Sequence, residues 1–350
     1  MQQFTPNYYH DFRCLAGACS DSCCKEWDVE VDDASAAYYR SLSGSLGDLL
    51  RSVLQDTPEG VVMRQTDRRC PMWRRDGLCR IHAELGAGAL CQVCRDFPRI
   101  SHDYGNFVEL GLELSCPEAA RLILSASPEA MTCQEISGGS APEYDLHTMA
   151  VLRESRAAVL ALLQDTHYSL PERLAAMLVY SSGVEGALCG GALPACQPEA
   201  LLTSGKKLAS PPDVSGFLDF YRRLEILTPQ WRSRLAQPVP GAWFEEIAAL
   251  ARYGVQRYWL QAVSDGEIWA RVKFIISGAL LVNLLGGDTV STAQLYSKEI
   301  ENDPENVAAI LDGAYSAPAL TDSHLLGLLL RDDDVPSSAF KNFKKISKST

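Results

Sequence analysis

The chain has 350 residues, of which 47% are hydrophobic and 22% are charged, so it can build two domains of ordinary size and is not a disordered chain. Its formal net charge is −12, which argues against a general nucleic-acid binder because such proteins normally present a basic surface. An acidic surface suits a basic, lysine-bearing partner, but plain solubility explains it more simply.

Two features predict a cytoplasmic protein. The N-terminal sequence MQQFTPNYYHDF lacks the basic stretch and the apolar core of a secretory signal. The longest apolar run, Phe274 to Leu285, is interrupted by polar residues and glycine, and it fits a buried helix better than a membrane span. Thiols stay reduced in the cytosol, so a dense set of cysteines there indicates metal binding or catalysis rather than disulfides.

The first third of the chain is chemically distinct because it holds most of the cysteines. Nine of the twelve lie within the first 116 residues, and we predict that they are metal ligands: Cys14, Cys19, Cys23, Cys24, Cys70, Cys79, Cys91, Cys94 and Cys116. Thiolates bind zinc, iron and iron–sulfur clusters, and the number of cysteines does not decide which metal is bound. The alternative is buried structural cysteine, which we prefer for Cys133, Cys189 and Cys196.

Local patterns in this region predict few regular elements. Apolar and acidic residues alternate over 27–32, which predicts one short strand, and Asp33 is expected to cap a helix that runs to Leu42. Residues 64–82 carry many charges, and we expect a loop held by something other than an apolar core.

Two later motifs strengthen the metal prediction. Cys91 and Cys94 form a C-x2-C pair, whose turn can place two sulfurs on one metal. Cys116 lies within a capping-box pattern, Ser115 to Glu118, and a helix N-terminus there would favour its thiolate. His82 follows Cys79 by three residues and is either a nitrogen ligand or an ordinary helix histidine.

The remainder of the chain reads as successive helices. Ser169 to Glu172 forms a second capping box, residues 247–259 carry an apolar stripe of helical period, and Asp303 followed by proline predicts another helix start. Residues 183–212 are rich in glycine, proline and serine, and we expect a long loop there, including the glycine-rich stretch GVEGALCGG.

These patterns predict a mainly α fold with an irregular, cysteine-rich, metal-binding N-terminal region containing little β, followed by a multi-helix domain. The loop SGGSAP at 137–142 is the best candidate boundary. The predicted division is a cysteine-rich domain at 1–136, an all-helical domain at 143–335 and a mobile basic tail at 336–350.

The cysteine motifs resemble the flagellin lysine-N-methylase family. The resemblance is carried by YYHDFRCLAGACSDSCCKEWDVEVD at 8–32, GLCRIHAELG at 77–86, LCQVCRDFPRI at 90–100 and ELSCPEAARLIL at 113–124. The first 125 residues also resemble a wider group of zinc- or iron-chelating cysteine-cluster domains. The long helical continuation of this chain favours the narrower family.

The resemblance implies a protein-lysine N-methyltransferase that transfers methyl groups from S-adenosylmethionine to surface lysines of flagellin. It also implies a [4Fe-4S] cluster held by the N-terminal cysteines, with zinc as the alternative metal. One such cluster takes four thiolates at most, so nine candidates suggest either a second metal or additional structural cysteines.

The residues leave the mechanism open. If the lysine amine attacks the methyl group of the donor directly, the amine must first be neutral. If an iron–sulfur cluster takes part, it could instead supply an electron that cleaves the sulfonium of the methyl donor. The C-x3-C-x2-C spacing of radical enzymes and the G-x-G-x-x-G loop of Rossmann methylases are both absent, so the catalytic residues and the methyl-donor site are unassigned. A non-enzymatic zinc-binding module with a helical interaction domain and a redox or metal-handling protein are the alternatives.

Overall fold

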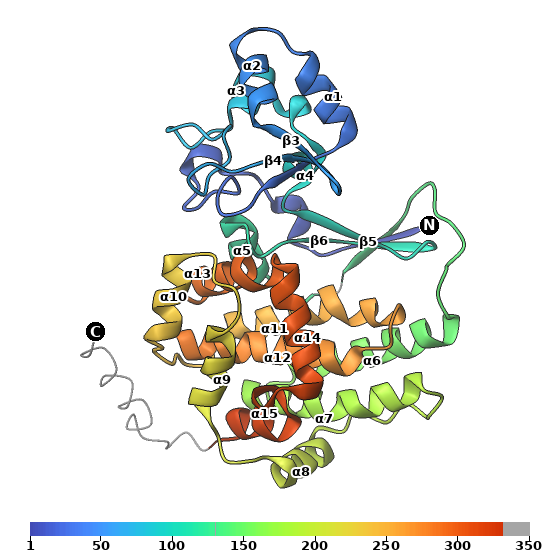
Figure 1. Ribbon diagram of the computed structural model, residues 1–350. Coiled ribbons are helices and arrows are strands. Elements are labelled where there is room, and N and C mark those ends of the chain that lie inside the picture. The colour runs from blue at the N-terminus through green and yellow to red at the C-terminus, as the bar shows by residue number, and fades with distance from the viewer. Residues whose placement is uncertain (130, 332–350) are drawn as a thin grey trace, which may run out of the picture.

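The computed structural model describes residues 1–129 and 131–331, and it divides visibly into two parts (Figure 1). Residues 13–96 form a small lobe, here called the cysteine lobe, above a larger helical body made of residues 1–12, 97–129 and 131–331. The described residues contain 15 α-helices, which confirms the mainly α prediction. The predicted basic tail at 336–350 lies outside the described residues.

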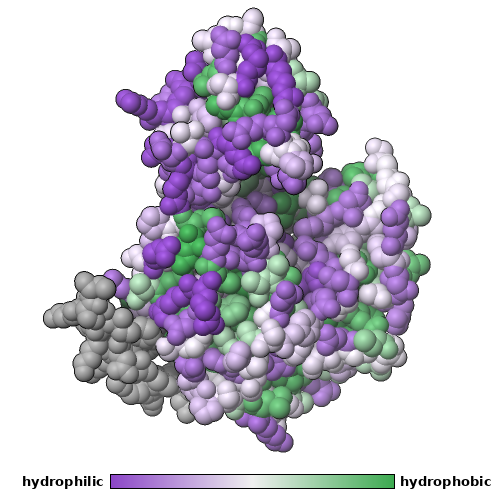
Figure 2. Space-filling model, viewed as in Figure 1, coloured by the Kyte–Doolittle hydropathy of each residue, from purple (hydrophilic) through white to green (hydrophobic). Residues whose placement is uncertain are grey.

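The cysteine lobe is built on a three-stranded antiparallel sheet with the strand order β2-β4-β3. Its elements are β2 (Val29–Val31), α1 (Asp33–Ser41), α2 (Gly44–Val53), β3 (Leu54–Thr57), β4 (Gly60–Met63), α3 (Arg80–Leu85) and α4 (Gln92–Asp96). The predicted strand near residue 29 is therefore confirmed. Figure 2 shows hydrophilic side chains over most of the visible face of this lobe.

Two cysteines belong to the lobe's small apolar core. Cys70 and Cys91 are buried in one cluster with side chains such as Val31, Tyr39 and Leu50. The charged segment at 64–79 forms only isolated bridges between Lys25 and Arg69, Thr66 and Arg69, and Trp73 and Cys79. The apolar core of this lobe is small, and two of its members are cysteines.

A second sheet joins the chain's N-terminus to the segments that follow the lobe. It contains β1 (Gln2–Thr5), β5 (Arg99–Asp103), β6 (Phe107–Leu112) and β7 (Thr132–Glu135), in the order β5-β6-β1-β7. Strand β1 runs parallel to β6 and antiparallel to β7. The N-terminal region therefore carries two sheets, which is more β structure than we predicted. The second sheet could not be predicted because it pairs segments about a hundred residues apart, and such pairing leaves no local sequence pattern.

The helical body packs around one central helix. Its helices are α5 (Pro117–Leu124), α6 (Leu146–Gln164), α7 (Leu170–Leu188), α8 (Pro198–Leu208), α9 (Val214–Arg222), α10 (Pro229–Ala236), α11 (Glu245–Tyr258), α12 (Ile268–Leu285), α13 (Thr289–Tyr296), α14 (Pro304–Ser316) and α15 (Asp322–Leu329). Helix α12 contacts α7, α11 and α14. By length and composition α12 would suffice to cross a membrane, but 89% of it is buried in the structure, as expected of a core helix.

Several predicted helix starts hold and others shift. The capping box at Ser169 and the Asp303 cap are both present. The cap of α1 is Asp32 rather than Asp33, and α5 begins after Cys116 with no side-chain cap, so the Ser115 capping box is wrong. The long loop expected at 183–212 is also wrong, because α7 continues to Leu188 and α8 follows, with buried side chains outweighing the glycines.

Two apolar clusters support the two parts. The larger one includes Phe12, Phe107 and the buried face of α5 together with the helices, so the second sheet packs on the helical body. The smaller cluster draws only on residues 24–91 in the lobe. The predicted domain limits stay a prediction.

Candidate metal centre and the adjoining cleft

Six of the predicted ligands gather inside the cysteine lobe. This six-thiol group consists of Cys23, Cys24, Cys70, Cys79, Cys91 and Cys94. Cys23 contacts Cys24, which contacts Cys70, and Cys91 contacts Cys94. The backbone reinforces this arrangement, because the Cys70 N–H donates to the Cys24 carbonyl at 2.8 Å. The fold thus places cysteines that are far apart in the sequence close enough for their thiols to interact electrostatically.

The thiols share their protons unequally. In the C-x2-C pair, a hydrogen bond from Cys94 lowers the pKa of Cys91 to about 7, while the same bond raises the pKa of Cys94. The hydrogen bond with Cys24 raises the pKa of Cys23. The bond from Cys24 lowers the pKa of Cys70. The Cys23 contact lowers the pKa of Cys24, but the Cys70 contact and burial outweigh it and raise the pKa of Cys24 to about 12. Cys70 and Cys91 are therefore the two thiols of these contacts whose pKa moves toward the thiolate, the form that binds metals.

The other three predicted ligands form a separate group. Cys14 and Cys19 lie near Cys116, which precedes α5 on the helical body. Burial raises the pKa of Cys116 to about 11, although the backbone N–H groups of Ala119 and Glu118 lower it. Burial also raises the pKa of Cys19, which in addition faces Cys23. This three-thiol group therefore lies where the lobe meets the helical body.

The three cysteines predicted to be buried and structural lie apart from both thiol groups. Cys133 on β7 and Cys189 after α7 are exposed, so the prediction of burial is wrong for these two, whereas Cys196, before α8, is half-buried. The His82 side chain is exposed on α3, and it is the His82 backbone N–H that bonds the Cys79 thiol. The sequence-based ligand set thus divides into a group of six and a group of three.

The donors are thiols, which is the type of ligand that holds iron–sulfur clusters, but their side chains are not arranged around a common centre. In residues 1–129 and 131–331, no three His, Cys, Asp or Glu side chains are arranged as they stand to hold a metal ion. The six-thiol group nevertheless offers more thiols than the four that a cluster requires.

Asp32 supports the six-thiol group from outside. Its carboxylate accepts the Ser35 backbone N–H at 2.9 Å, which caps α1, and the Gln92 backbone N–H at 2.8 Å, which caps α4. Cys91 immediately precedes α4 and Cys94 lies within it. One carboxylate therefore fixes the C-x2-C segment to the rest of the lobe.

A cleft of about 460 Å³ opens on the helical body. It lies between α6, α11, the N-terminal segment and the segment that follows α5, and its walls include Phe4, Tyr8, Leu160, Tyr253 and Gln256. Its volume falls in the range of small-molecule sites.

The arginines of the cleft are held in different ways. Arg156 makes a two-pronged ion pair with Glu109 at 2.6 and 2.8 Å, and Arg252 pairs with Glu245 at 2.8 Å. Arg153 lies 4.0 Å from the centre of the Phe107 ring. Two of these three guanidinium charges are thus balanced by carboxylates within the structure.

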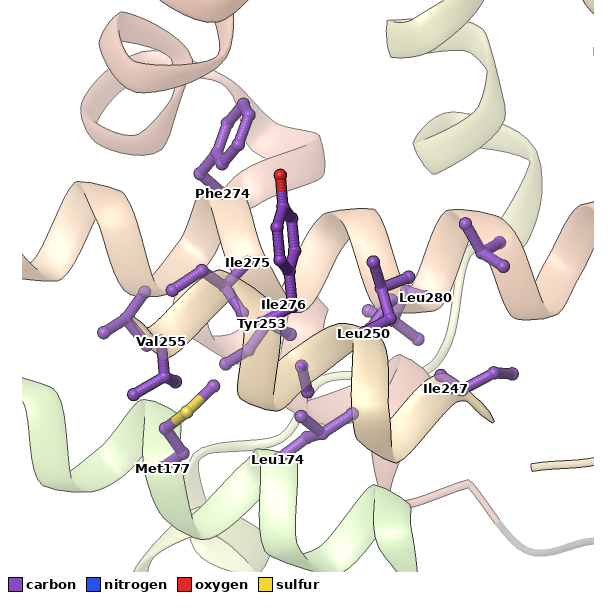
Figure 3. Packing of buried hydrophobic residues seen from close by; sticks show 14 of the residues in the cluster. Leu174, Met177, Ile247, Leu250, Tyr253, Val255, Phe274, Ile275, Ile276 and Leu280 are labelled. Atoms are coloured by element: carbon purple, nitrogen blue, oxygen red, sulfur yellow. The ribbon is translucent and has the colours of Figure 1, made fainter. Parts of the chain in front are cut away.

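A buried polar centre lies behind the cleft. Arg257 on α11 lies 3.5 Å from Glu113 and 3.8 Å from Glu301, and the Glu301 side chain is only 3% exposed. Tyr253 and Tyr258 each direct a hydroxyl to Glu301. In Figure 3 the Tyr253 hydroxyl points away from the apolar residues Leu174 and Met177.

This polar centre adjoins the three-thiol group. The Glu113 carbonyl accepts the Cys116 N–H at 3.4 Å, so the half-buried Glu113 and the buried Cys116 lie at the two ends of one short turn. Burial raises the pKa of Glu113, an effect opposed by Arg257. No sequence motif joins these residues, because Glu113 follows β6, the two tyrosines and Arg257 lie on α11, and Glu301 lies in the helical turn that follows α13.

A cysteine lobe joined to a helical body with a polar cleft defines the class as a cysteine-cluster protein. Over 142 residues, or 37% of the chain, the sequence is 33% identical to the flagellar biosynthetic protein FliU of Salmonella muenchen, and the match covers 80% of that relative. The chain belongs to the flagellin lysine-N-methylase family.

Two further relatives are lysine-N-methylases from Salmonella choleraesuis and Salmonella typhimurium, each 32% identical over 142 residues. The matched part of this chain spans 34% of the length of each of these two proteins. No family model matches the chain, and no solved structure matches it.

Proposed function

We propose that this protein is an S-adenosylmethionine-dependent protein-lysine N-methyltransferase that acts on surface lysines of flagellin in the cytoplasm. The observation that carries the proposal is the match to relatives named lysine-N-methylase and to a flagellar biosynthetic protein. The cleft beside the buried polar centre supports it, because an amine must be desolvated before it can attack a methyl group.

A direct assay tests the activity. The protein, purified without oxygen, is incubated with unmethylated flagellin and S-adenosylmethionine, and the flagellin is then digested and analysed by mass spectrometry. We expect lysine peptides that gain the mass of one or more methyl groups. Flagellin that stays unmodified, while a known lysine methylase modifies the same preparation, would contradict the proposal.

We also propose that the six-thiol group holds a [4Fe-4S] cluster. Its support is the convergence of more than four thiols on a lobe whose apolar core is small. When bound, such a cluster supplies thiolate-held iron capable of electron transfer. Zinc is the alternative metal, and the three-thiol group is either a second metal site or structural.

Replacing Cys94 tests the cluster. We expect Cys94→Ala to lose iron and acid-labile sulfide and to unfold at a lower denaturant concentration, because metal binding is coupled to folding. Iron, sulfide and zinc analysis with a visible spectrum measures the first effect. Cys196→Ala is the matched control and should keep the metal, since Cys196 lies outside both thiol groups.

The same analysis separates the alternatives. Equal amounts of iron and sulfide with a broad charge-transfer band support the cluster. Stoichiometric zinc without colour would overturn the cluster and leave either a zinc-stabilised methylase or a binding module. Unchanged metal in Cys94→Ala would remove this residue from the ligand set.

A further inference from the structure

His102 faces a small cavity at the inner end of the cleft. The cavity measures about 20 Å³, which is room for one water molecule, and it lies between β5, β6, α11 and the N-terminal segment. Tyr8, Met131, Tyr253 and Gln256 line both this cavity and the larger cleft, so the two spaces share a wall.

The Nε2 atom of His102 is buried and has no hydrogen-bond partner. A buried polar atom without a partner costs free energy, so its persistence suggests a ligand or a catalytic role. In the tautomer that carries its proton on Nδ1, the free Nε2 presents an unused lone pair to this part of the structure.

The charged neighbours of His102 are themselves paired. Glu109 lies opposite His102 in the β5–β6 register and binds Arg156 of α6. Arg257 of α11 lies beside Glu113 and Glu301. Tyr8 from the N-terminal segment and Tyr253 from α11 complete the titratable groups that line the cavity.

These surroundings keep His102 neutral. Burial lowers the pKa of His102, Arg257 lowers it further, and Glu109 opposes them. Burial likewise raises the pKa of Tyr8 and of Tyr253, so both hydroxyls keep their protons. Among the groups that line this cavity, His102 therefore has an unprotonated ring nitrogen free to accept a proton, whereas both tyrosines keep their protons and Glu109 is held by Arg156.

We propose that His102 is the general base that deprotonates the lysine substrate. This inference rests on the proposed function. A lysine side chain enters the cleft along Phe4 and Leu160, and its ammonium reaches the wall that Tyr8 and Tyr253 form between the cleft and the inner cavity. The proton passes to Nε2 through the one water for which the inner cavity has room, because His102 lines that cavity and not the cleft itself.

The step balances in atoms and electrons. The lysine N–H bond breaks and its proton binds Nε2, which gives an imidazolium and a neutral amine. The amine lone pair forms the new N–C bond as the S–C bond of the sulfonium donor breaks. The electron pair of that bond goes to sulfur, so the donor leaves as a neutral thioether, and His102 later returns its proton to water.

The test is a pH series of flagellin methylation with S-adenosylmethionine. We expect His102→Gln to lower the rate at neutral pH by about 10²-fold or more, because it removes the base but keeps a polar side chain. The loss should shrink as the pH approaches about 10, where lysine loses its proton unaided. His147→Gln, an exposed histidine on α6, is the matched control and should keep the wild-type profile.

A second variant guards against misfolding. His102→Ala leaves space for free imidazole, which should restore part of the activity, while metal content and binding of S-adenosylhomocysteine stay at the wild-type level. A wild-type pH profile in His102→Gln, or no rescue in a folded His102→Ala protein, would overturn the role of His102. Absence of methylation by the wild-type protein would instead overturn the proposed function and this inference with it.

Discussion

At the scale of the residue, single polar side chains organise the cysteine lobe. Asp32 caps two helices, and the one it fixes at Gln92 carries half of the C-x2-C pair. The sequence pattern placed the α1 cap one residue too late, because two adjacent aspartates offer the same chemistry. Only the folded lobe, by bringing Gln92 within reach, distinguishes Asp32 from Asp33.

Asp32→Ala should destabilise the lobe by about 1–2 kcal/mol at neutral pH, because it removes the carboxylate that caps two helices. The N–H of Gln92 lowers the pKa of Asp32 to about 2, with Ser35 adding to the effect. A depressed carboxyl pKa gives stability that is present above the unfolded value of about 3.9 and is lost as the pH falls toward about 2. Urea unfolding at several pH values measures both effects.

Asp33→Ala is the control for this prediction. Asp33 is exposed and lies one residue away at the start of the same helix. If both variants lose the same stability, the cap on α4 contributes nothing and Asp32 does not hold the C-x2-C segment.

At the scale of the element, close helix packing positions the polar centre. Gly254 on α11 faces Ile275 on α12, and a Cβ built at Gly254 would meet Ile275 Cγ2 at 2.9 Å. Tyr253 and Arg257 lie on the same helix as this contact. The apolar stripe predicted α11 correctly, but the stripe alone does not tell how near α12 approaches.

Gly254→Ala should therefore cost about 1–3 kcal/mol, because overpacking against Ile275 outweighs the higher helix propensity of alanine. Gly186→Ala on α7 is the matched control: a Cβ there meets nothing within 4 Å, so this variant should gain up to about 1 kcal/mol. Thermal unfolding of both variants measures the difference. A Gly254→Ala protein as stable as Gly186→Ala would show that α11 and α12 separate without cost.

At the scale of the whole molecule, one ion pair ties the cysteine lobe to the helical body. Lys298 Nζ lies 2.8 Å from an Asp21 carboxylate oxygen and 5.1 Å from the centre of the Trp27 ring, and its side chain is 3% exposed. Burial would raise the pKa of Asp21, but Lys298 outweighs it and the pKa is lowered. The pair joins residues on opposite sides of the boundary, beside the Cys19 and Cys23 thiols.

Lys298→Ala should cost about 1–3 kcal/mol because it leaves the half-buried Asp21 carboxylate without its main partner. We expect faster cleavage between the lobe and the body in limited proteolysis, with the difference from the wild type shrinking at acid pH as Asp21 is protonated. Lys25→Ala removes the longer, more exposed contact to Asp21 at 3.6 Å and should have little effect. Equal cleavage of both variants would contradict a joining role for Lys298.

The sequence by itself determined the mainly helical class, the two helix starts at Ser169 and Asp303, and the family, because helical periodicity, capping and cysteine spacing are local properties. Only the tertiary structure decided that the nine cysteines divide into six and three, that strands β1 to β7 form two sheets, and that His102 lines one cavity with Tyr8, Tyr253 and Arg257. The physical reason is that these contacts join residues far apart in the chain, whose approach depends on packing that no local pattern encodes.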